Sequence, residues 1–138
     1  MTFTEIVKKY SRLGESLVEV VASPQAFSLS AVHKGLLFVL APWSAQSIQA
    51  FQALTHALSE LARLPPVFAV SIDDLKNHGS LRKLERSCEG KGEVFWIAGG
   101  KLVHALTLSG ADSVRAAVEY THDLAKNETR DDRESDRR

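Results

Sequence analysis

Two serines, Ser44 and Ser47, lie three positions apart at the predicted start of a helix, where side chains are best placed for chemistry. They follow a continuous apolar run, Leu36–Leu40, and the linker at 41–43. Hydroxyls in a first helical turn accept hydrogen bonds from exposed backbone N–H groups, so N-capping is the simplest role for both serines. The same N–H groups and the helix dipole favour negative charge, so the alternative is a site for an anion or a peptide carboxylate.

A serine nucleophile would need a general base within hydrogen-bond reach. The five histidines are scattered along the chain, and the sequence pairs none of them with Ser44: His33, His56, His78, His104 and His122. They also lack the spacing of metal ligands, and a single cysteine excludes a cysteine-rich zinc site. The sequence therefore indicates no catalytic residue, and we expect neither a metal nor a cofactor.

The single cysteine, Cys88, cannot form a disulfide within the chain. Arg86 and Lys91 flank it and would lower the pKa of its thiol, while Glu85 and Glu89 would oppose that effect. One interpretation is a buried apolar cysteine. The other is a surface thiol that acts as a redox sensor or as the centre of a single-thiol oxidoreductase.

Length and composition indicate one soluble domain. The chain has 138 residues, of which 44% are hydrophobic and 25% charged, enough to bury a core without disulfides or metal. Seventeen basic residues balance seventeen acidic ones, and this zero formal net charge argues against nucleic acid or an anionic membrane as the main partner. The first residues lack an apolar signal-peptide core, and no run approaches the ~18 apolar residues of a membrane span. We therefore expect a cytoplasmic protein.

Apolar spacing and turn residues predict alternating helices and strands. Five short apolar runs are typical of strands: Leu17–Ala22, Leu36–Leu40, Val67–Ile72, Glu93–Ala98 and Lys101–Leu106. Helical spacing predicts a helix that opens at Ser23 and ends at Gly35, and further helices over Ser44–Arg63, Leu75–Arg86 and Ala111–Ala125. Gly99-Gly100 has the composition of a two-residue hairpin turn. Short βαβ connections imply parallel pairing, and the final hairpin makes the sheet mixed.

Both ends of the chain are predicted to lie outside this core. At residues 1–14 helical spacing predicts an amphipathic helix, with Thr2 and Glu5 as its capping box and Gly14 as its stop. The apolar side of that helix would pack on the sheet of its own domain or mediate a homodimer. The segment 126–138 is charged and lacks apolar residues, so we expect a disordered tail. The remaining domain is 15–125.

This order resembles the thioredoxin-like superfamily over Leu17–Leu124. The linker A-P-W at 41–43 lies where thioredoxins carry the start of W-C-x-x-C, Gly99-Gly100-Lys101 lies at their hairpin, and Ser109-Gly110-Ala111 lies at the turn into their last helix. The resemblance implies an α/β fold: a thioredoxin-like three-layer α/β/α sandwich with a mixed central sheet, here with an extra N-terminal helix.

The residues of thioredoxin redox chemistry are absent from the matching positions. Ser44 and Ser47 replace both cysteines, and a hydroxyl cannot form or exchange a disulfide. When the chain is aligned on Trp43, Phe38 lies where thioredoxins have a buried acid. When it is aligned on the Gly99-Gly100 turn, Gly92 lies where they have a cis-proline. The resemblance therefore implies a redox-inactive member without the C-x-x-C pair.

Such a protein would use the shape of the fold to bind another protein or peptide. We predict a non-catalytic module of the chaperone, assembly-factor or inhibitor type, and a single-thiol enzyme or a structural oligomerisation module remain the alternatives. Trp43 is either core packing or an exposed anchor of that surface. The expected binding surface comprises Pro42, Trp43, Ser44, Gln46, Ser47, Lys91, Gly92 and Glu93.

Overall fold

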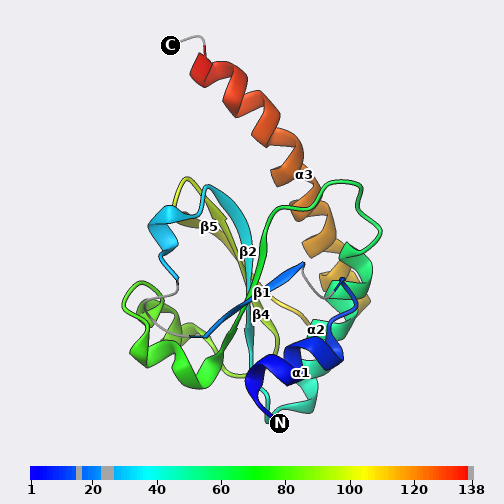
Figure 1. Cartoon of the computed structure of the whole chain (residues 1–138). Coiled ribbons are helices and arrows are strands. Elements are labelled where there is room, and N and C mark those ends of the chain that lie inside the picture. Colours follow the sequence, from blue (N-terminus) through cyan, green and yellow to red (C-terminus); the bar gives the residue numbers. More distant parts are fainter. Residues whose placement is uncertain (15–16, 23–26, 137–138) are drawn as a thin grey trace.

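A five-stranded mixed sheet forms the centre of this computed structural model, which describes residues 1–14, 17–22 and 27–136, with side chains as far as Lys126. Its strands are β1 (Val18–Val21), β2 (Lys34–Leu40), β3 (Val67–Ser71), β4 (Glu93–Ala98) and β5 (Lys101–Thr107). Their spatial order is β1-β3-β2-β4-β5 (Figure 1). The strands β1 and β2 run parallel to β3, whereas β4 is antiparallel to β2 and β5 is antiparallel to β4. The predicted mixed sheet is confirmed.

The central strand β2 is buried along its whole length, as its continuous apolar sequence predicts. It begins two residues before the predicted Leu36, because Lys34 pairs with Ala98 on β4. On its other side Phe38 pairs with Ala69 of β3. Because β2 is paired with β3 on one side and β4 on the other, the position of its last residue is fixed, and the chain passes from there to the start of α2.

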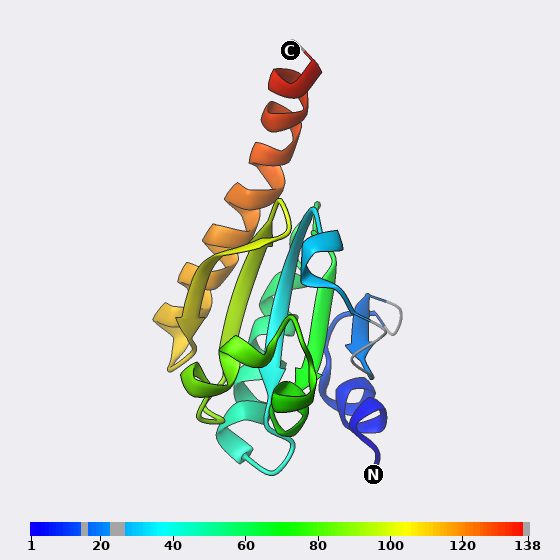
Figure 2. The same cartoon turned by 90° about the vertical axis from the view of Figure 1, so that its left-hand side faces the viewer.

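Three α-helices cover one face of the sheet: α1 (Phe3–Tyr10), α2 (Ala45–Leu58) and α3 (Ala111–Asp136) (Figures 1 and 2). The core on this side is built from side chains of β2, β4 and α2, including Phe38, Phe51 and Trp96, all of which are fully buried. Trp96 also donates a hydrogen bond from Nε1 to Thr121 Oγ1 of α3, 3.0 Å away. This bond satisfies the polar atom of a buried indole and fixes α3 against β4.

The N-terminal helix α1 packs on its own domain. Thr2 is its N-cap and accepts a hydrogen bond from Glu5 N at 3.1 Å, as the sequence predicts. Val7 is buried within the core, and beyond the helix the backbone of Arg12 donates to Thr55 Oγ1 of α2 at 2.9 Å. Of the two alternatives for the apolar side of α1, the structure therefore has the intramolecular one. A homodimer through this helix stays a prediction.

The opposite face is covered by three short 3₁₀ helices: η2 (Leu29–Ala31), η3 (Ile72–Asn77) and η4 (Arg82–Ser87). The prediction of one α-helix over Leu75–Arg86 is therefore wrong. The buried side chains of this segment recur every third residue, at Leu75, His78, Leu81 and Leu84. A 3₁₀ helix has 3.0 residues per turn, so this spacing keeps all four side chains on one side, whereas an α-helix would rotate them away.

Two other predicted helices differ from the structure in extent. The helix predicted from Ser23 to Gly35 opens outside the described residues, and within them only η2 is helical before β2 begins. The end of α2 lies at Leu58 rather than Arg63, where hydrogen bonds to third-preceding carbonyls tighten the chain, such as Leu61 N to Leu58 O at 3.0 Å.

The last helix, α3, is longer than predicted. It continues to Asp136, through the charged segment predicted as a disordered tail, and projects beyond the rest of the molecule (Figure 1). The division into 1–14, 15–125 and 126–138 itself stays a prediction. In the described part of the chain, neither α3 nor any other helix is both long and apolar enough to cross a membrane.

Candidate functional site

The first hydroxyl of the candidate site, on Ser44, caps helix α2. Its Oγ accepts a hydrogen bond from Ser47 N at 3.3 Å, so the predicted N-cap is confirmed. The same hydroxyl donates its proton to the carbonyl oxygen of Gly90, 2.8 Å away. A hydroxyl that donates to a backbone carbonyl is bonded to no general base, and this geometry opposes a nucleophilic role.

The second hydroxyl, on Ser47, is fully buried. Its Oγ accepts a hydrogen bond from Ala41 N at 2.9 Å, in the linker that precedes the helix, rather than from an N–H of the helix itself. The sequence predicts Ser47 to be an N-cap and part of the binding surface. It instead ties the end of β2 to the first turn of α2, and a partner cannot reach it in this arrangement.

The loop opposite the serines depends on two glycines with positive φ. Gly90 has φ +81°, and an added Cβ would lie 2.9 Å from the ring of Trp43. Gly92 has φ +105°, and an added Cβ would lie 2.6 Å from the Cβ of Ala50 on α2. Proline holds φ near −65°, so the backbone at Gly92, the position aligned with the cis-proline of thioredoxins, has a conformation that proline cannot adopt.

The carboxylate of Glu93 holds this loop from within. The side chain is only 3% exposed, and its Oε2 accepts hydrogen bonds from Glu89 N at 3.0 Å and Lys91 N at 3.3 Å. Its Oε1 is buried without a hydrogen-bond partner among the described residues. In the sheet Glu93 pairs with Val39 on one side and Thr107 on the other. Glu93 is thus an internal support of the predicted surface rather than a contact residue.

Trp43 is the exposed aromatic side chain at this end of the sheet, with 64% of its surface accessible. Its Nε1 donates a hydrogen bond to Asp73 Oδ1 at 3.2 Å, and its ring lies against Gly90. Beside it opens a hollow of about 350 Å³ that is also lined by Lys76, Glu85 and Cys88. Of the two interpretations of Trp43, core packing is excluded. The bond to Asp73 orients an indole that the core does not use.

The environment of Cys88 opposes thiolate formation. The side chain is half-buried, and burial together with the nearby carboxylate of Glu93 raises the pKa of its thiol to about 12. The sequence predicts that Lys91 lowers this pKa, but its Nζ pairs with Glu89 Oε2 at 3.0 Å, and this pairing raises the pKa of Lys91 itself. Thiol reactivity requires the thiolate, so this site lacks the electropositive surroundings of a redox cysteine.

The predicted surface therefore separates into two sets. The inner residues are committed to the fold by burial or hydrogen bonding: Ser44, Ser47, Gly92 and Glu93. The outer residues present side chains to solvent, fully or in part: Pro42, Trp43, Gln46 and Lys91. Gln46 also borders an apolar hollow of about 630 Å³ between α2 and the start of α3, where Ala50, Leu108 and Val114 lie.

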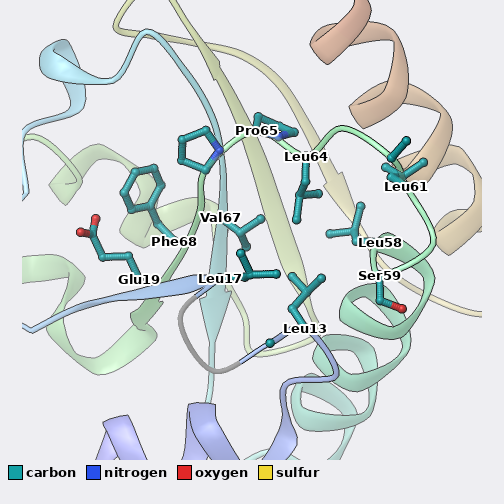
Figure 3. A pocket seen from close by; sticks show the side chains of 13 residues that line it. Leu13, Leu17, Glu19, Leu58, Ser59, Leu61, Leu64, Pro65, Val67 and Phe68 are labelled. Atoms are coloured by element: carbon teal, nitrogen blue, oxygen red, sulfur yellow. The ribbon is translucent and has the colours of Figure 1, made fainter.

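A larger hollow of about 800 Å³ lies towards the other end of α2 (Figure 3). Leu13, Leu58 and Val67 converge there from three segments, and Glu19 is a charged residue of its wall. The side chains predicted as a binding surface gather at the start of α2, so this hollow forms a separate feature. Its apolar walls carry few polar groups that would select a particular ligand.

Sequence reasoning missed the role of Asp73, which orients Trp43 from thirty residues away. The hydrogen bond joins the ends of two non-adjacent segments, so no local pattern marks it. Among the described residues, no group of three His, Cys, Asp or Glu side chains is placed to hold a metal ion.

Comparisons with known proteins identify the fold. No family model and no curated protein matches the sequence. Among solved structures, oxidised thioredoxin O2 from Arabidopsis thaliana superposes with a TM-score of 0.56 at 14% identity, covering 80% of this chain and 98% of that one. A mutant thioredoxin from Halobacterium salinarum gives 0.56 at 14% identity, with 78% and 90% covered.

The J-Trx1 fragment of ERdj5 superposes with a TM-score of 0.58 at 10% identity, covering 88% of this chain and 55% of that fragment. Likeness at these identities shows the fold and nothing finer. With the sheet order, the flanking helices and a single cysteine, it leads to one conclusion. The chain has a thioredoxin-like α/β fold with an additional N-terminal helix, and it lacks the C-x-x-C pair.

Proposed function

We propose that this chain is a non-catalytic protein-binding module, of the chaperone, assembly-factor or inhibitor type, and that Trp43 anchors its partner. The observation that carries the proposal is the exposure of an oriented indole: 64% of Trp43 is accessible while Asp73 fixes its Nε1. Indole side chains contribute disproportionately to protein interfaces because they bury a large area with few rotatable bonds.

The inner residues support this proposal because their reactive groups are not available for catalysis. Ser44 and Ser47 direct their hydroxyls into the fold, and the pKa of Cys88 disfavours its thiolate. The chemistry that the chain offers at this end is therefore contact area and a few polar groups. Lys91 and Gln46 would form the rim around Trp43.

The expected mode of contact is through side chains rather than through an added strand. At the neighbouring loop, the carbonyl of Gly90 accepts from Ser44, Lys91 N donates to Glu93, and the carbonyl of Gly92 accepts from Leu108 N. These backbone groups already have partners inside the domain. An extended peptide would find fewer hydrogen-bonding groups here than a strand edge provides, so Trp43 carries more of the proposed binding.

The test compares two exposed apolar residues at different places on the molecule. Proteins recovered with the wild-type chain are quantified against those recovered with Trp43→Ala and with Leu17→Ala. Leu17 is 52% exposed and lies next to the edge strand β1, where it lines the separate hollow at the other end of α2. We expect Trp43→Ala to lower recovery of a specific partner at least about ten-fold, the size of an interface hot spot. Leu17→Ala should leave recovery unchanged.

A photo-crosslinking side chain locates the contact independently. Placed at Gln46, at the start of α2, it should crosslink to the same partner. Placed at the exposed Glu60, just beyond the other end of α2, it should not. Equal recovery with Trp43→Ala, or equal crosslinking from both positions, would remove this surface from consideration.

A further inference from the structure

We propose that the partner bound at Trp43 presents an arginine side chain, which stacks on the indole and enters the hollow beside it. This inference rests on the proposed function and deepens it, because it names the chemistry that the partner brings to the same surface. The hollow has a volume of about 350 Å³ and is lined by six residues: Trp43, Ile72, Asp73, Lys76, Glu85 and Cys88.

The indole of Trp43 offers an accessible aromatic surface in a fixed position. Its Nε1 donates a hydrogen bond to Asp73 Oδ1 at 3.2 Å. The six-membered part of the ring contacts the loop at Gly90, where Cη2 lies 2.9 Å from the position of an added Cβ. The ring is thus held at both ends while 64% of the side chain stays accessible. Tryptophan is the aromatic side chain whose face attracts cations most strongly.

Two exposed carboxylates line the same hollow. Asp73 lies at the Nε1 edge of the indole, and Glu85 belongs to η4. Among the described residues neither forms an ion pair, and Lys76, the basic residue of the lining, pairs with neither of them. The described wall therefore carries two negative charges and one positive charge. The other basic residues of η4 are not among those that line the hollow: Arg82, Lys83 and Arg86.

A third carboxylate, that of the buried Glu93, acts on the hollow from inside the domain. Burial and, in addition, the charge of Glu93 raise the pKa of the Cys88 thiol, which lines the hollow. The Oε1 atom of Glu93 has no hydrogen-bond partner among the described residues, and Lys91 Nζ is paired with Glu89 instead. A cation in the hollow would gain from this field, whereas an anion would be repelled.

The position of Asp73 favours a planar cation. Its carboxylate lies at the edge of the indole, so a guanidinium stacked on the ring can donate N–H groups to it. A lysine ammonium is more strongly hydrated and has no plane to stack, so it would gain less from the same surface. A metal ion fits less well, because no described group of three His, Cys, Asp or Glu side chains is placed to hold one.

A peptide selection tests this chemistry before any partner is known. The probe is a phage library of short random peptides, selected on the wild-type chain after removal of those that bind Trp43→Ala. We expect arginine to be enriched at least about three-fold over the starting library, lysine less, and acidic residues to be depleted. Peptides that need Trp43 but are not enriched in arginine would overturn this inference and leave the proposed function standing. A selection without Trp43-dependent peptides would overturn both.

Variants of the hollow test whether charge recognises a selected arginine peptide. In isothermal titrations we expect Glu85→Gln, which removes a charge at nearly constant size, to weaken binding about two- to five-fold. Lys76→Gln removes the competing cation and should strengthen binding about two-fold. Glu60→Gln makes the same change at an exposed position beyond the other end of α2 and should have no effect. Damage to the fold would weaken binding in both hollow variants, so only charge recognition gives opposite signs. Equal affinities for all variants would overturn the proposal.

A change in the peptide locates the cation in the hollow. Replacing its arginine with glutamine should weaken binding to the wild-type chain at least about five-fold, and replacement with lysine should weaken it less. Against the glutamine peptide, Glu85→Gln should cost nothing further, because the carboxylate has lost its partner. If Glu85→Gln instead weakened both peptides by the same factor, Glu85 and the arginine would act independently, and the proposed placement of the cation would be wrong.

Discussion

The inner residues of the candidate site find hydrogen-bond partners within the domain, whereas the outer residues are exposed to solvent. The hydroxyls of Ser44 and Ser47 are bonded within the domain, and the carboxylate of Glu93 accepts two loop N–H groups. Trp43 instead keeps 64% of its surface in solvent although its Nε1 is bonded to Asp73. The two sets lie side by side, so their difference in burial and hydrogen bonding is a property of the individual residues and not of this whole end of the fold.

This difference shows which residues of a thioredoxin-like fold without the C-x-x-C pair serve the fold itself and which remain available for contact. In the thioredoxin-like alignment the positions of the sulfurs are occupied by groups that stabilise the helix start and the adjacent loop. Loss of an inner residue should therefore change stability, and loss of an outer residue should change binding. Four predictions test this separation.

The largest effect is expected from Gly92→Ala. The new Cβ would meet Ala50 at 2.6 Å, and the residue would have to keep φ at +105°. Backbone strain of about 1–3 kcal/mol and overpacking of about 1–3 kcal/mol should lower the free energy of unfolding by about 2–6 kcal/mol in a denaturant titration. Gly79→Ala is the control, since nothing lies within 4 Å of its added Cβ. Similar losses in the two variants would contradict the structural role of Gly92.

The second effect concerns the two hydrogen bonds of Ser44. We expect Ser44→Ala to lower the free energy of unfolding by about 1–2 kcal/mol, because the helix loses its N-cap and Gly90 loses a donor. Ser44→Asp separates the two roles, since aspartate can cap the helix but cannot donate to the Gly90 carbonyl. Urea titrations should place Ser44→Asp between wild type and Ser44→Ala. No loss in either variant would show that both bonds are dispensable.

The inner residues also show what the sequence could predict. The apolar run before Ser44 identifies the central strand β2, and the positions of Gly99 and Gly100 identify the hairpin, where φ is +59° and +74°. Both predictions depend on local requirements, namely burial on two faces and positive φ. The cap at Ser44 is predictable for the same reason, because it acts within one helical turn.

The features that the sequence does not predict depend on contacts between distant segments, or on a spacing of buried residues that is close to that of an α-helix. The sequence assigns both Glu93 and Lys91 to a binding surface, yet only the fold reveals that one is buried and the other paired with Glu89. The repeat of three residues from Leu75 to Leu84 is visible in the sequence. It differs from an α-helical repeat only when followed over three turns, so a single-helix interpretation matches it nearly as well.

The third effect is a pH dependence at Cys88. Burial and Glu93 raise the pKa of the folded thiol to about 12, whereas the ordinary value of a cysteine thiol, taken for the unfolded chain, is 9.0. The unfolded chain therefore loses this proton first, and the stability contributed by the protonated thiol is present below about pH 9 and falls as the pH rises towards 12. Subtracting the unfolding free energy of Cys88→Ala from that of wild type at each pH isolates this slope.

The rate at which Cys88 is alkylated in the folded protein reports the same difference in thiol pKa. At a pH below both values, the thiolate fraction should be about 1,000-fold lower in the folded protein than in urea, from a pKa difference of about three units. Glu93→Gln should raise the native rate, since it removes a negative charge next to the thiol. A native rate equal to that in urea would instead support the single-thiol alternative.

The last effect is that of Trp43→Ala, which we expect to fall mainly on binding, and it sharpens the comparison most. An indole that is 64% exposed buries only about a third of its area, so the free energy of unfolding should fall by at most about 2 kcal/mol. Trp43→Phe keeps an aromatic ring but removes the donor to Asp73, so it tests whether orientation matters for binding. Isothermal titration with a partner identified by crosslinking should rank wild type above Trp43→Phe and Trp43→Phe above Trp43→Ala. Ser44→Asp should bind as wild type does, because the outer residues remain in place. If Trp43→Ala instead unfolded the domain as readily as Gly92→Ala, the indole would belong to the inner set, and the separation between fold and binding would fail at its most exposed residue.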